Sequence, residues 1–200
     1  MTRIGWVLGW AVPEAWFAPL AQAALPNAEH LFFSAAPETL ENIRAAGQFD
    51  WLVGYSLGAQ LLLAGGPRTE RVALLAPIFA FSHEKNTGGR TARAQVKFLA
   101  RWLRRDSKPA LADFYARARL DVPRELTNSL GPEVLQWGLT QLETVALPPE
   151  LPPGWRAWCG ADDALLDAVR LHELASEITI LAGATHHPAA LLRAFAEEAT

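Results

Sequence analysis

The sequence predicts an α/β protein with a mostly parallel sheet of about six strands flanked by helices. Two observations lead to this class. Short apolar runs alternate with helix-like segments over roughly the first 80 residues, and the alternation returns after residue 155. Alternating strands and helices imply βαβ units, whose strands run parallel and are buried on both faces. Half of the 200 residues are hydrophobic, which is enough for one domain with a sizeable core.

The strand-like and helix-like segments follow one another in a regular order. The first part of the chain predicts strands at residues 3–8, 30–34, 50–55 and 72–76, with helices at 13–24, 37–46 and 57–64. The last part predicts strands at 156–159 and 177–181, with helices at 166–174 and 188–198. Pro13 suits the first turn of its helix, because a proline there costs the helix no hydrogen bond.

The alternation stops after Pro77. Residues 85–143 contain helix-like segments but no strand candidate, and a proline-rich stretch at 147–154 follows them. We therefore predict a helical cap at residues 81–149, inserted into a core made of residues 1–80 and 150–200.

The N-terminus has some features of a secretion signal. Arg3 precedes an apolar stretch at 4–12, and residues 21–23 could serve as a cleavage site. That stretch is short and contains two glycines, and its removal would delete the first predicted strand, so a secretion signal is disfavoured.

The single cysteine, Cys159, excludes an internal disulfide framework, so we expect a reducing, cytoplasmic setting. No run approaches the roughly 20 apolar residues of a membrane span, and we expect no membrane partner.

The sequence Gly-Tyr-Ser-Leu-Gly at residues 54–58 lies between a predicted strand and a predicted helix. In this G-x-S-x-G pattern the chain turns sharply and lifts the serine hydroxyl clear of the sheet. Glycines are needed because the tight turn leaves almost no room for side chains beside it. The pattern therefore indicates a nucleophilic serine, Ser56, although a simple glycine-rich turn remains the alternative.

A nucleophilic serine needs a histidine as its base and a carboxylate to orient that histidine. Asp162 and Asp163 follow one predicted strand, and His186 and His187 follow the next. The serine, acid and histidine thus come in the chain order that accompanies such a turn. We also expect one of the two aspartates to cap the following helix. No Cys/His cluster has zinc-site spacing, so we predict neither a metal site nor a cofactor.

Ester chemistry at a serine also needs two main-chain N–H groups that hold the oxyanion. Leu57 follows the serine directly, and Trp10 lies in the loop after the first predicted strand. We predict these two as the donors. The side chains of Trp10 and Trp16 could otherwise be core aromatics, and for Trp16 we favour that role.

These residues resemble the α/β-hydrolase superfamily, and within it the pimeloyl-[acyl-carrier protein] methyl ester esterases of biotin synthesis. That family has a Gly-Trp pair after its first core strand, followed by a second tryptophan, as in Gly9-Trp10 and Trp16. Its serine turn is Gly-Trp-Ser-Leu-Gly, which differs from residues 54–58 at one position.

The resemblance also chooses between the paired candidates. The family's acid stands three residues after a glycine, which selects Asp163, three after Gly160, over Asp162. Its histidine follows two small residues, which selects His186 over His187.

The chain departs from the family's pattern at several points. Leu8 stands where the usual His-Gly motif has its histidine, and Tyr55 replaces the tryptophan of the serine turn. The chain also begins at what corresponds to the family's third strand, so the resemblance implies a sheet without two edge strands. The likeness covers residues 3–80 and 155–198, and the predicted cap matches only in being helical and basic.

The predicted cap carries most of the positive charge. Residues 85–124 hold 11 of the 18 basic residues and three acidic ones, none of them glutamate. Six of the basic residues are spaced by three or four, which predicts a continuous basic helix face. Val96, Leu99 and Leu103 would then face the core. An unneutralised face of this kind attracts an acidic partner. The six residues are Arg90, Arg93, Lys97, Arg101, Arg104 and Lys108.

The resemblance implies an esterase that removes the methyl ester from a pimeloyl chain carried by an acidic acyl carrier protein. The six basic residues would dock that carrier. A solvated surface or an anionic small substrate is the alternative, and nucleic acid is disfavoured because no nucleic-acid motif accompanies the charge. Two other functions stay open: a general small-molecule carboxylesterase or thioesterase, and a non-catalytic binding protein on a hydrolase scaffold.

Overall fold

A six-stranded sheet, parallel between every pair of neighbouring strands, forms the centre of the protein. The computed structural model describes residues 1–66, 71–129 and 131–199. The strand order across the sheet is β2-β1-β3-β4-β5-β6. All six predicted strands are therefore confirmed. They are β1 (Arg3–Val7), β2 (Glu29–Phe33), β3 (Trp51–Tyr55), β4 (Val72–Leu75), β5 (Arg156–Gly160) and β6 (Ile178–Leu181).

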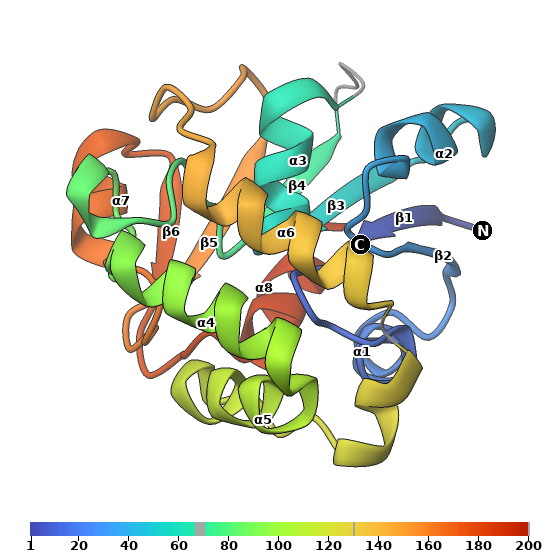
Figure 1. Cartoon of the computed structure of the whole chain (residues 1–200). Helices are drawn as coiled ribbons and strands as arrows, with labels where there is room; N and C mark the ends of the chain where they lie inside the picture. Colours follow the sequence, from blue (N-terminus) through green and yellow to red (C-terminus); the bar gives the residue numbers. More distant parts are fainter. Residues whose placement is uncertain (67–70, 130, 200) are drawn as a thin grey trace.

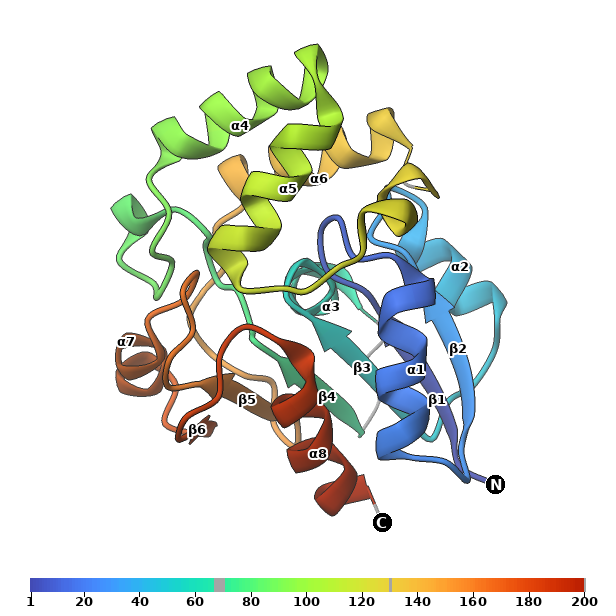
Figure 2. The same cartoon turned by 90° about the horizontal axis from the view of Figure 1, so that it is seen from below.

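Helices cover both faces of this sheet. On one face α1 and α8 pack against each other, and α2 and α3 lie together on the other, while α7 packs on β6 (Figures 1 and 2). These five helices occupy the predicted segments within two residues at each end. Their bounds are α1 (Glu14–Ala24), α2 (Thr39–Ala45), α3 (Leu57–Gly65), α7 (Ala168–Leu174) and α8 (Pro188–Ala199).

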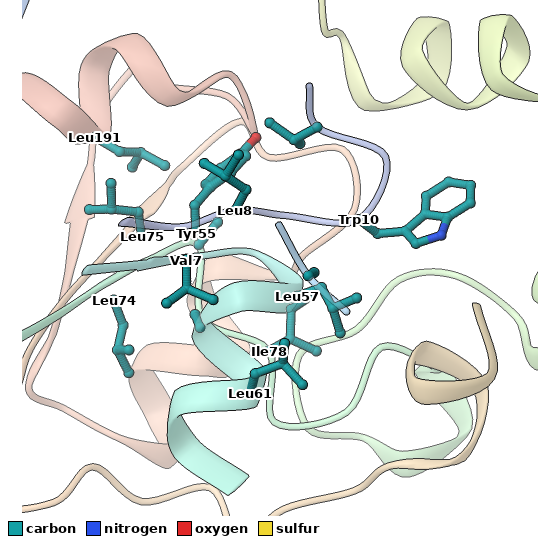
Figure 3. Packing of buried hydrophobic residues seen from close by; sticks show 14 of the residues in the cluster. Val7, Leu8, Trp10, Tyr55, Leu57, Leu61, Leu74, Leu75, Ile78 and Leu191 are labelled. Atoms are coloured by element: carbon teal, nitrogen blue, oxygen red, sulfur yellow. The ribbon is translucent and has the colours of Figure 1, made fainter. Parts of the chain in front are cut away.

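The inner strands are the most deeply buried elements. Every residue of β3 and β4 is buried, whereas the edge strand β2 is only partly covered. Burial on both faces explains why the inner strands are almost wholly apolar runs rather than alternating patterns. Figure 3 shows Val7 and Leu74 on the side of the sheet where Leu57 and Leu61 of α3 lie, and Leu75 on the opposite side with Leu191 of α8.

The segment between β4 and β5 is helical, as the sequence predicts. It contains the helices α4 (Arg93–Arg105), α5 (Ser107–Ala118) and α6 (Pro132–Thr144), with short 3₁₀ turns at His83–Lys85 and Arg124–Ser129. Helix α4 packs on both α5 and α6, and the three helices stand together on one side of the sheet (Figure 2). Val96, Leu99 and Leu103 of α4 are buried, as expected.

The topology creates a natural place for a site. After β1 the chain forms β2 on one side of it and then crosses to form β3 on the other side. In a parallel sheet such a reversal leaves a crevice at the carboxyl ends of the two strands. The loops after β1 and β3, which carry Trp10 and Ser56, both leave the sheet there.

None of the helices within the described ranges is long and apolar enough to cross a membrane.

Candidate active site

Ser56 sits on a strained turn between β3 and α3. Its backbone has φ 54° and ψ −115°, a conformation that side-chain-bearing residues rarely adopt. Such strain persists only where the surrounding structure enforces it, and it is typical of functional positions. The Ser56 N–H continues the β3–β4 ladder by donating to the Leu75 carbonyl at 2.8 Å. This hydrogen bond fixes the main chain of Ser56 at the carboxyl end of β3.

The two glycines of the turn are required by close backbone contacts. A Cβ atom on Gly58 would lie 2.0 Å from the Val7 carbonyl oxygen, and one on Gly54 would lie 2.7 Å from the Ala59 Cα. Neither obstacle is a flexible side chain that could move aside. The prediction that the tight turn leaves no room for side chains at these two positions is therefore confirmed. Residue 58 at the start of α3 packs directly on the main chain of β1, and residue 54 of β3 packs directly on the main chain of α3.

A continuous chain of hydrogen bonds joins Ser56, His186 and Asp163. The Nε2 atom of His186 lies 3.1 Å from Ser56 Oγ, and its Nδ1 lies 2.7 Å from Asp163 Oδ2. Asp163 Oδ1 accepts from the main-chain N–H groups of Leu165 and Leu166, at 2.8 and 3.0 Å. All three side chains are buried. An ionised Asp163 accepts only, so Nδ1 must donate to it and Nε2 is left to accept from the serine hydroxyl.

The loops after β5 and β6 bring the acid and the histidine together. The Asp162 N–H donates to the Ala184 carbonyl at 2.8 Å, which ties one loop to the other. A Cβ on Gly160 would lie 2.4 Å from the same carbonyl oxygen, so only glycine allows this approach. Asp163 and His186 are therefore placed by main-chain contacts as well as by their own hydrogen bond.

The neighbouring candidates have other surroundings. Asp162 is exposed, and within the described residues the only hydrogen bond found for it is the main-chain one to Ala184. His187 turns to Asp121, with Nε2 at 3.0 Å from Oδ1, and its ring packs edge-on against Trp16. The Trp16 indole also donates to Asp121 at 3.2 Å. Partial desolvation raises the pKa of this exposed carboxyl, but the hydrogen bonds from His187 and Trp16 outweigh it, so the pKa of Asp121 is lowered.

The prediction that Asp162 or Asp163 caps the following helix is wrong. Neither Asp162 nor Asp163 caps α7, because the acid loop makes a further turn before that helix begins. Asp167 is the N-cap residue, and its side chain accepts from the Arg170 N–H at 3.1 Å. Asp163 uses its second oxygen for the turn at Leu165 and Leu166 instead.

Sequence reasoning missed one buried contact of the histidine. The hydroxyl of Tyr55, directly before the serine, donates to the His186 carbonyl at 2.7 Å. Burial, and then the nearby charge of Asp163, raises the pKa of this hydroxyl well above its usual value. It therefore stays a neutral donor and ties the histidine loop to β3. The sequence contained one signal for this contact. Tyr55 stands where the methyl ester esterases have a tryptophan, and tyrosine has a hydroxyl group that tryptophan lacks.

The two predicted oxyanion donors belong to segments that meet at Ser56. Leu57 is the first residue of α3, where a helix leaves its N–H groups without intrahelical partners. The loop with Trp10 passes so close that a Cβ on Gly9 would lie 3.2 Å from the Ser56 Cβ. The Trp10 indole donates to the Leu135 carbonyl of α6 at 2.8 Å, and its ring points away from the strand residues (Figure 3).

The prediction of a continuous basic helix face is wrong. Helix α4 ends at Arg105, so Lys108 belongs to α5, and Arg90 precedes α4 in the loop after the first 3₁₀ turn. Arg90 instead donates to the Asp163 carbonyl at 3.0 Å. Glu143 of α6 partly neutralises the face, at 3.1 Å from Arg93 Nε and 3.6 Å from Lys97 Nζ.

The single cysteine, Cys159, does not compete with this serine as a nucleophile. Burial raises the pKa of the Cys159 thiol far above its usual value, so the thiolate is not formed near neutral pH. Within the described ranges, no group of three His, Cys, Asp or Glu side chains is arranged to hold a metal ion.

The six-stranded parallel sheet with its flanking helices is the α/β-hydrolase fold. Among solved structures, the chain is similar to an esterase from Exiguobacterium antarcticum, with a TM-score of 0.75 and 13% identity over 99% of this chain and 90% of that one. It is similar to the bottromycin epimerase BotH, with a TM-score of 0.70 and 16% identity over 100% and 91%. It is also similar to the RedJ thioesterase of prodiginine biosynthesis in Streptomyces coelicolor, with a TM-score of 0.54 and 14% identity over 98% and 90%. No protein-family model and no curated protein matches the sequence.

These likenesses show the fold and leave the reaction open. An esterase, a thioesterase and an epimerase share the architecture, so the same scaffold serves different reactions. The reaction of this chain depends on the side chains around Ser56.

Proposed function

We propose that the protein is a serine hydrolase that cleaves a carboxylic ester or thioester through an acyl-enzyme on Ser56. The observation that carries the proposal is the hydrogen-bonded chain from Ser56 through His186 to Asp163, at 3.1 and 2.7 Å. A non-catalytic binding protein would have no need of a strained serine turn joined to a buried histidine and carboxylate.

Each residue then has a defined part in the reaction. Ser56 Oγ attacks the substrate carbonyl while His186 Nε2 takes the hydroxyl proton, and Asp163 keeps the other proton on Nδ1. The N–H groups of Trp10 and Leu57 stabilise the oxyanion of the tetrahedral intermediate. His186 returns the proton to the leaving alcohol or thiol. Water, deprotonated by His186, then attacks the acyl-enzyme, releases the acid and restores Ser56.

Replacement of the nucleophile tests this proposal. Ser56→Ala should reduce hydrolysis of short p-nitrophenyl esters to the background rate, and a fluorophosphonate should add its mass to Ser56 in the native protein only. Ser107→Ala, at an exposed serine that begins α5, is the matched control and should keep both properties. Ester turnover retained in Ser56→Ala, or a native protein that takes no label, would contradict the proposal.

A narrower candidate substrate is the pimeloyl-[acyl-carrier protein] methyl ester of biotin synthesis. The observation that favours it is the positive charge on α4 and α5 that no acidic side chain of the described residues neutralises. Arg101, Arg104 and Lys108 are exposed, and no acidic partner is found for them within the described residues. Such a surface attracts an acidic carrier, whereas Arg93 and Lys97 already share Glu143.

Charge reversal separates this candidate from a general esterase. The double variant Arg101→Glu/Arg104→Glu should lower kcat/KM for the carrier-linked methyl ester about 10-fold or more at low salt. Hydrolysis of p-nitrophenyl esters should follow the native protein. The control is Arg193→Glu, at an exposed arginine of α8. Equal losses with both substrates, or failure of the gene to restore growth of a biotin auxotroph lacking its methyl ester esterase, would favour the general esterase.

A further inference from the structure

A pocket of about 250 Å³ lies between the helices α4, α5 and α6 and the loop that carries Asp163. Its lining is divided in chemical character. Most of the wall is apolar and comes from the three helices, through Val96, Leu99, Phe114, Leu139 and Leu142. The remaining polar part contains Arg90, Thr91, Gln95 and Arg117.

The pocket adjoins the candidate active site on two sides. Leu165 lines it, and the N–H of the same residue donates to Asp163 Oδ1 at 2.8 Å. Phe114 lines it from α5, and its ring meets the Trp10 ring edge-on at 4.6 Å between centroids. Leu165 therefore contacts both the pocket and the acid, and Phe114 contacts both the pocket and the Trp10 ring.

All the charge in this lining is positive. Arg90 and Arg117 line the pocket, and no aspartate or glutamate does. Arg90 is fixed in place, because its main-chain N–H donates to the Leu165 carbonyl at 2.9 Å and its Nη1 donates to the Asp163 carbonyl at 3.0 Å. Its nearest carboxylate, Asp167, is 3.9 Å away, beyond hydrogen-bond distance.

Arg117 is held less firmly. It pairs with Asp113 one turn earlier on α5, and both side chains are more than a third exposed. Exposed pairs of this kind contribute little, so an anion in the pocket can compete for the guanidinium. Gln95 uses its side-chain oxygen to accept from the Ala92 N–H at 2.8 Å, which leaves its amide N–H groups as further donors.

We propose that this pocket binds the far end of a short, apolar substrate chain that terminates in a carboxylate. The apolar wall covers the chain, and the guanidinium groups of Arg90 and Arg117 hold the carboxylate. Arginine suits this role because its planar fork pairs with both oxygens of a carboxylate. The volume lies just below the ~300 Å³ at which drug-sized ligand sites begin, so the chain must be short.

This inference rests on the proposed serine hydrolase and defines its substrate class: monoesters of short dicarboxylic acids. It is an alternative to the carrier-linked substrate, whose far end is joined to the carrier and carries no carboxylate. The two substrates also use different cations, since the carrier would meet Arg101 and Arg104 on the exposed side of α4.

The test compares pairs of substrates that differ only at the far end. Each pair consists of the monomethyl ester of a straight-chain dicarboxylic acid and the same ester with a terminal amide, which has the same shape but no charge. The native protein should prefer the acid in kcat/KM by about 10-fold, the worth of one charge-assisted hydrogen bond. Arg117→Gln should abolish most of that preference, while Arg193→Gln on α8 should keep it. Equal turnover of both members by the native protein would overturn the inference and leave the serine hydrolase standing.

A binding measurement keeps the inference testable if no turnover is seen. In the Ser56→Ala protein, calorimetry should show tighter binding of the acid than of the amide, and Arg90→Gln in that background should reduce the difference. Because the hydrolytic step is absent there, changes in Asp163 positioning do not enter the result. Failure of the proposed hydrolase would appear as a lack of fluorophosphonate labelling, whereas equal binding of acid and amide would refute the pocket assignment alone.

Discussion

The candidate active site and the exposed face of α4 are both rich in polar side chains but are organised in opposite ways. Ser56, His186 and Asp163 are buried and joined by hydrogen bonds of 2.7–3.1 Å. The α4 cations are exposed, and those with a partner share the single carboxylate of Glu143 from another helix.

This difference determines how much each group can contribute. A buried polar network is expensive to leave unsatisfied, so every member is placed by several contacts and a single change spreads through it. An exposed ion pair is weakened by water and salt, so its members are nearly independent. Removal of a hydrogen-bonding group should therefore have a large effect on catalysis or stability at the site, whereas removal of an ion pair on α4 should change stability little.

The largest effect is expected for Asp163→Asn. Two main-chain N–H groups, from Leu165 and Leu166, bind Oδ1, so the asparagine must place its oxygen there and turn its NH₂ toward His186. His186 Nδ1 then has to accept, which moves the proton to Nε2 and removes the base from Ser56. We expect kcat for p-nitrophenyl esters to fall about 10⁴-fold, as such a wrong tautomer does in a serine triad.

The adjacent aspartate provides the control for this prediction. Asp162→Asn removes the same charge one residue away, at an exposed side chain with no hydrogen bond in the described part of the protein. It should leave kcat unchanged. If Asp162→Asn were the inactive variant, the acid would be Asp162, and the hydrogen bond of Asp163 to His186 would have another purpose.

A middle-sized effect is expected for Tyr55→Phe. The change removes the 2.7 Å hydrogen bond to the His186 carbonyl at a fully buried position, and it should lower the free energy of unfolding by about 1–2 kcal/mol. Activity should fall far less than in Asp163→Asn, because the imidazole keeps both of its own partners. Urea unfolding measures the first effect and ester kinetics the second.

Tyr115→Phe is a useful comparison, since that hydroxyl donates to the Ala11 carbonyl at 2.6 Å and is also buried. Burial raises the pKa of both phenols, so each remains a neutral donor. Similar losses of stability in the two variants are expected. A Tyr55→Phe protein as stable as the native one would show that the bond to His186 contributes nothing.

The parts of the fold and site that sequence could predict are those that depend on neighbouring residues along the chain. All six strands follow from apolar runs, and strand ends converging at one edge of a parallel sheet bring Ser56 together with an aspartate and a histidine. The choice of Asp163 over Asp162 and of His186 over His187 came from the resemblance to the methyl ester esterases. The bond from Tyr55 to His186 joins residues 131 positions apart, and no local pattern contains it.

The predicted basic face was wrong for the same reason. Spacing by three or four describes a helix only as far as that helix extends, and α4 stops at Arg105. The pairing of Arg93 and Lys97 with Glu143 depends on how α4 packs against α6, which the spacing of charges does not contain. The cap of α7 by Asp167 was missed because the acid loop is longer than the strand and helix signals suggested.

The smallest effect is expected for Glu143→Gln, which removes the shared partner of Arg93 and Lys97. Both cations are about half exposed, so the free energy of unfolding should fall by less than about 1 kcal/mol. The loss should disappear in 1 M salt, where the Debye length is only about 3 Å. Glu150→Gln, at an exposed glutamate without an ion pair in the described residues, controls for the change in net charge. A loss above 2 kcal/mol that persisted in salt would mean that this pair behaves like the buried site, and that the contrast between the two regions does not hold.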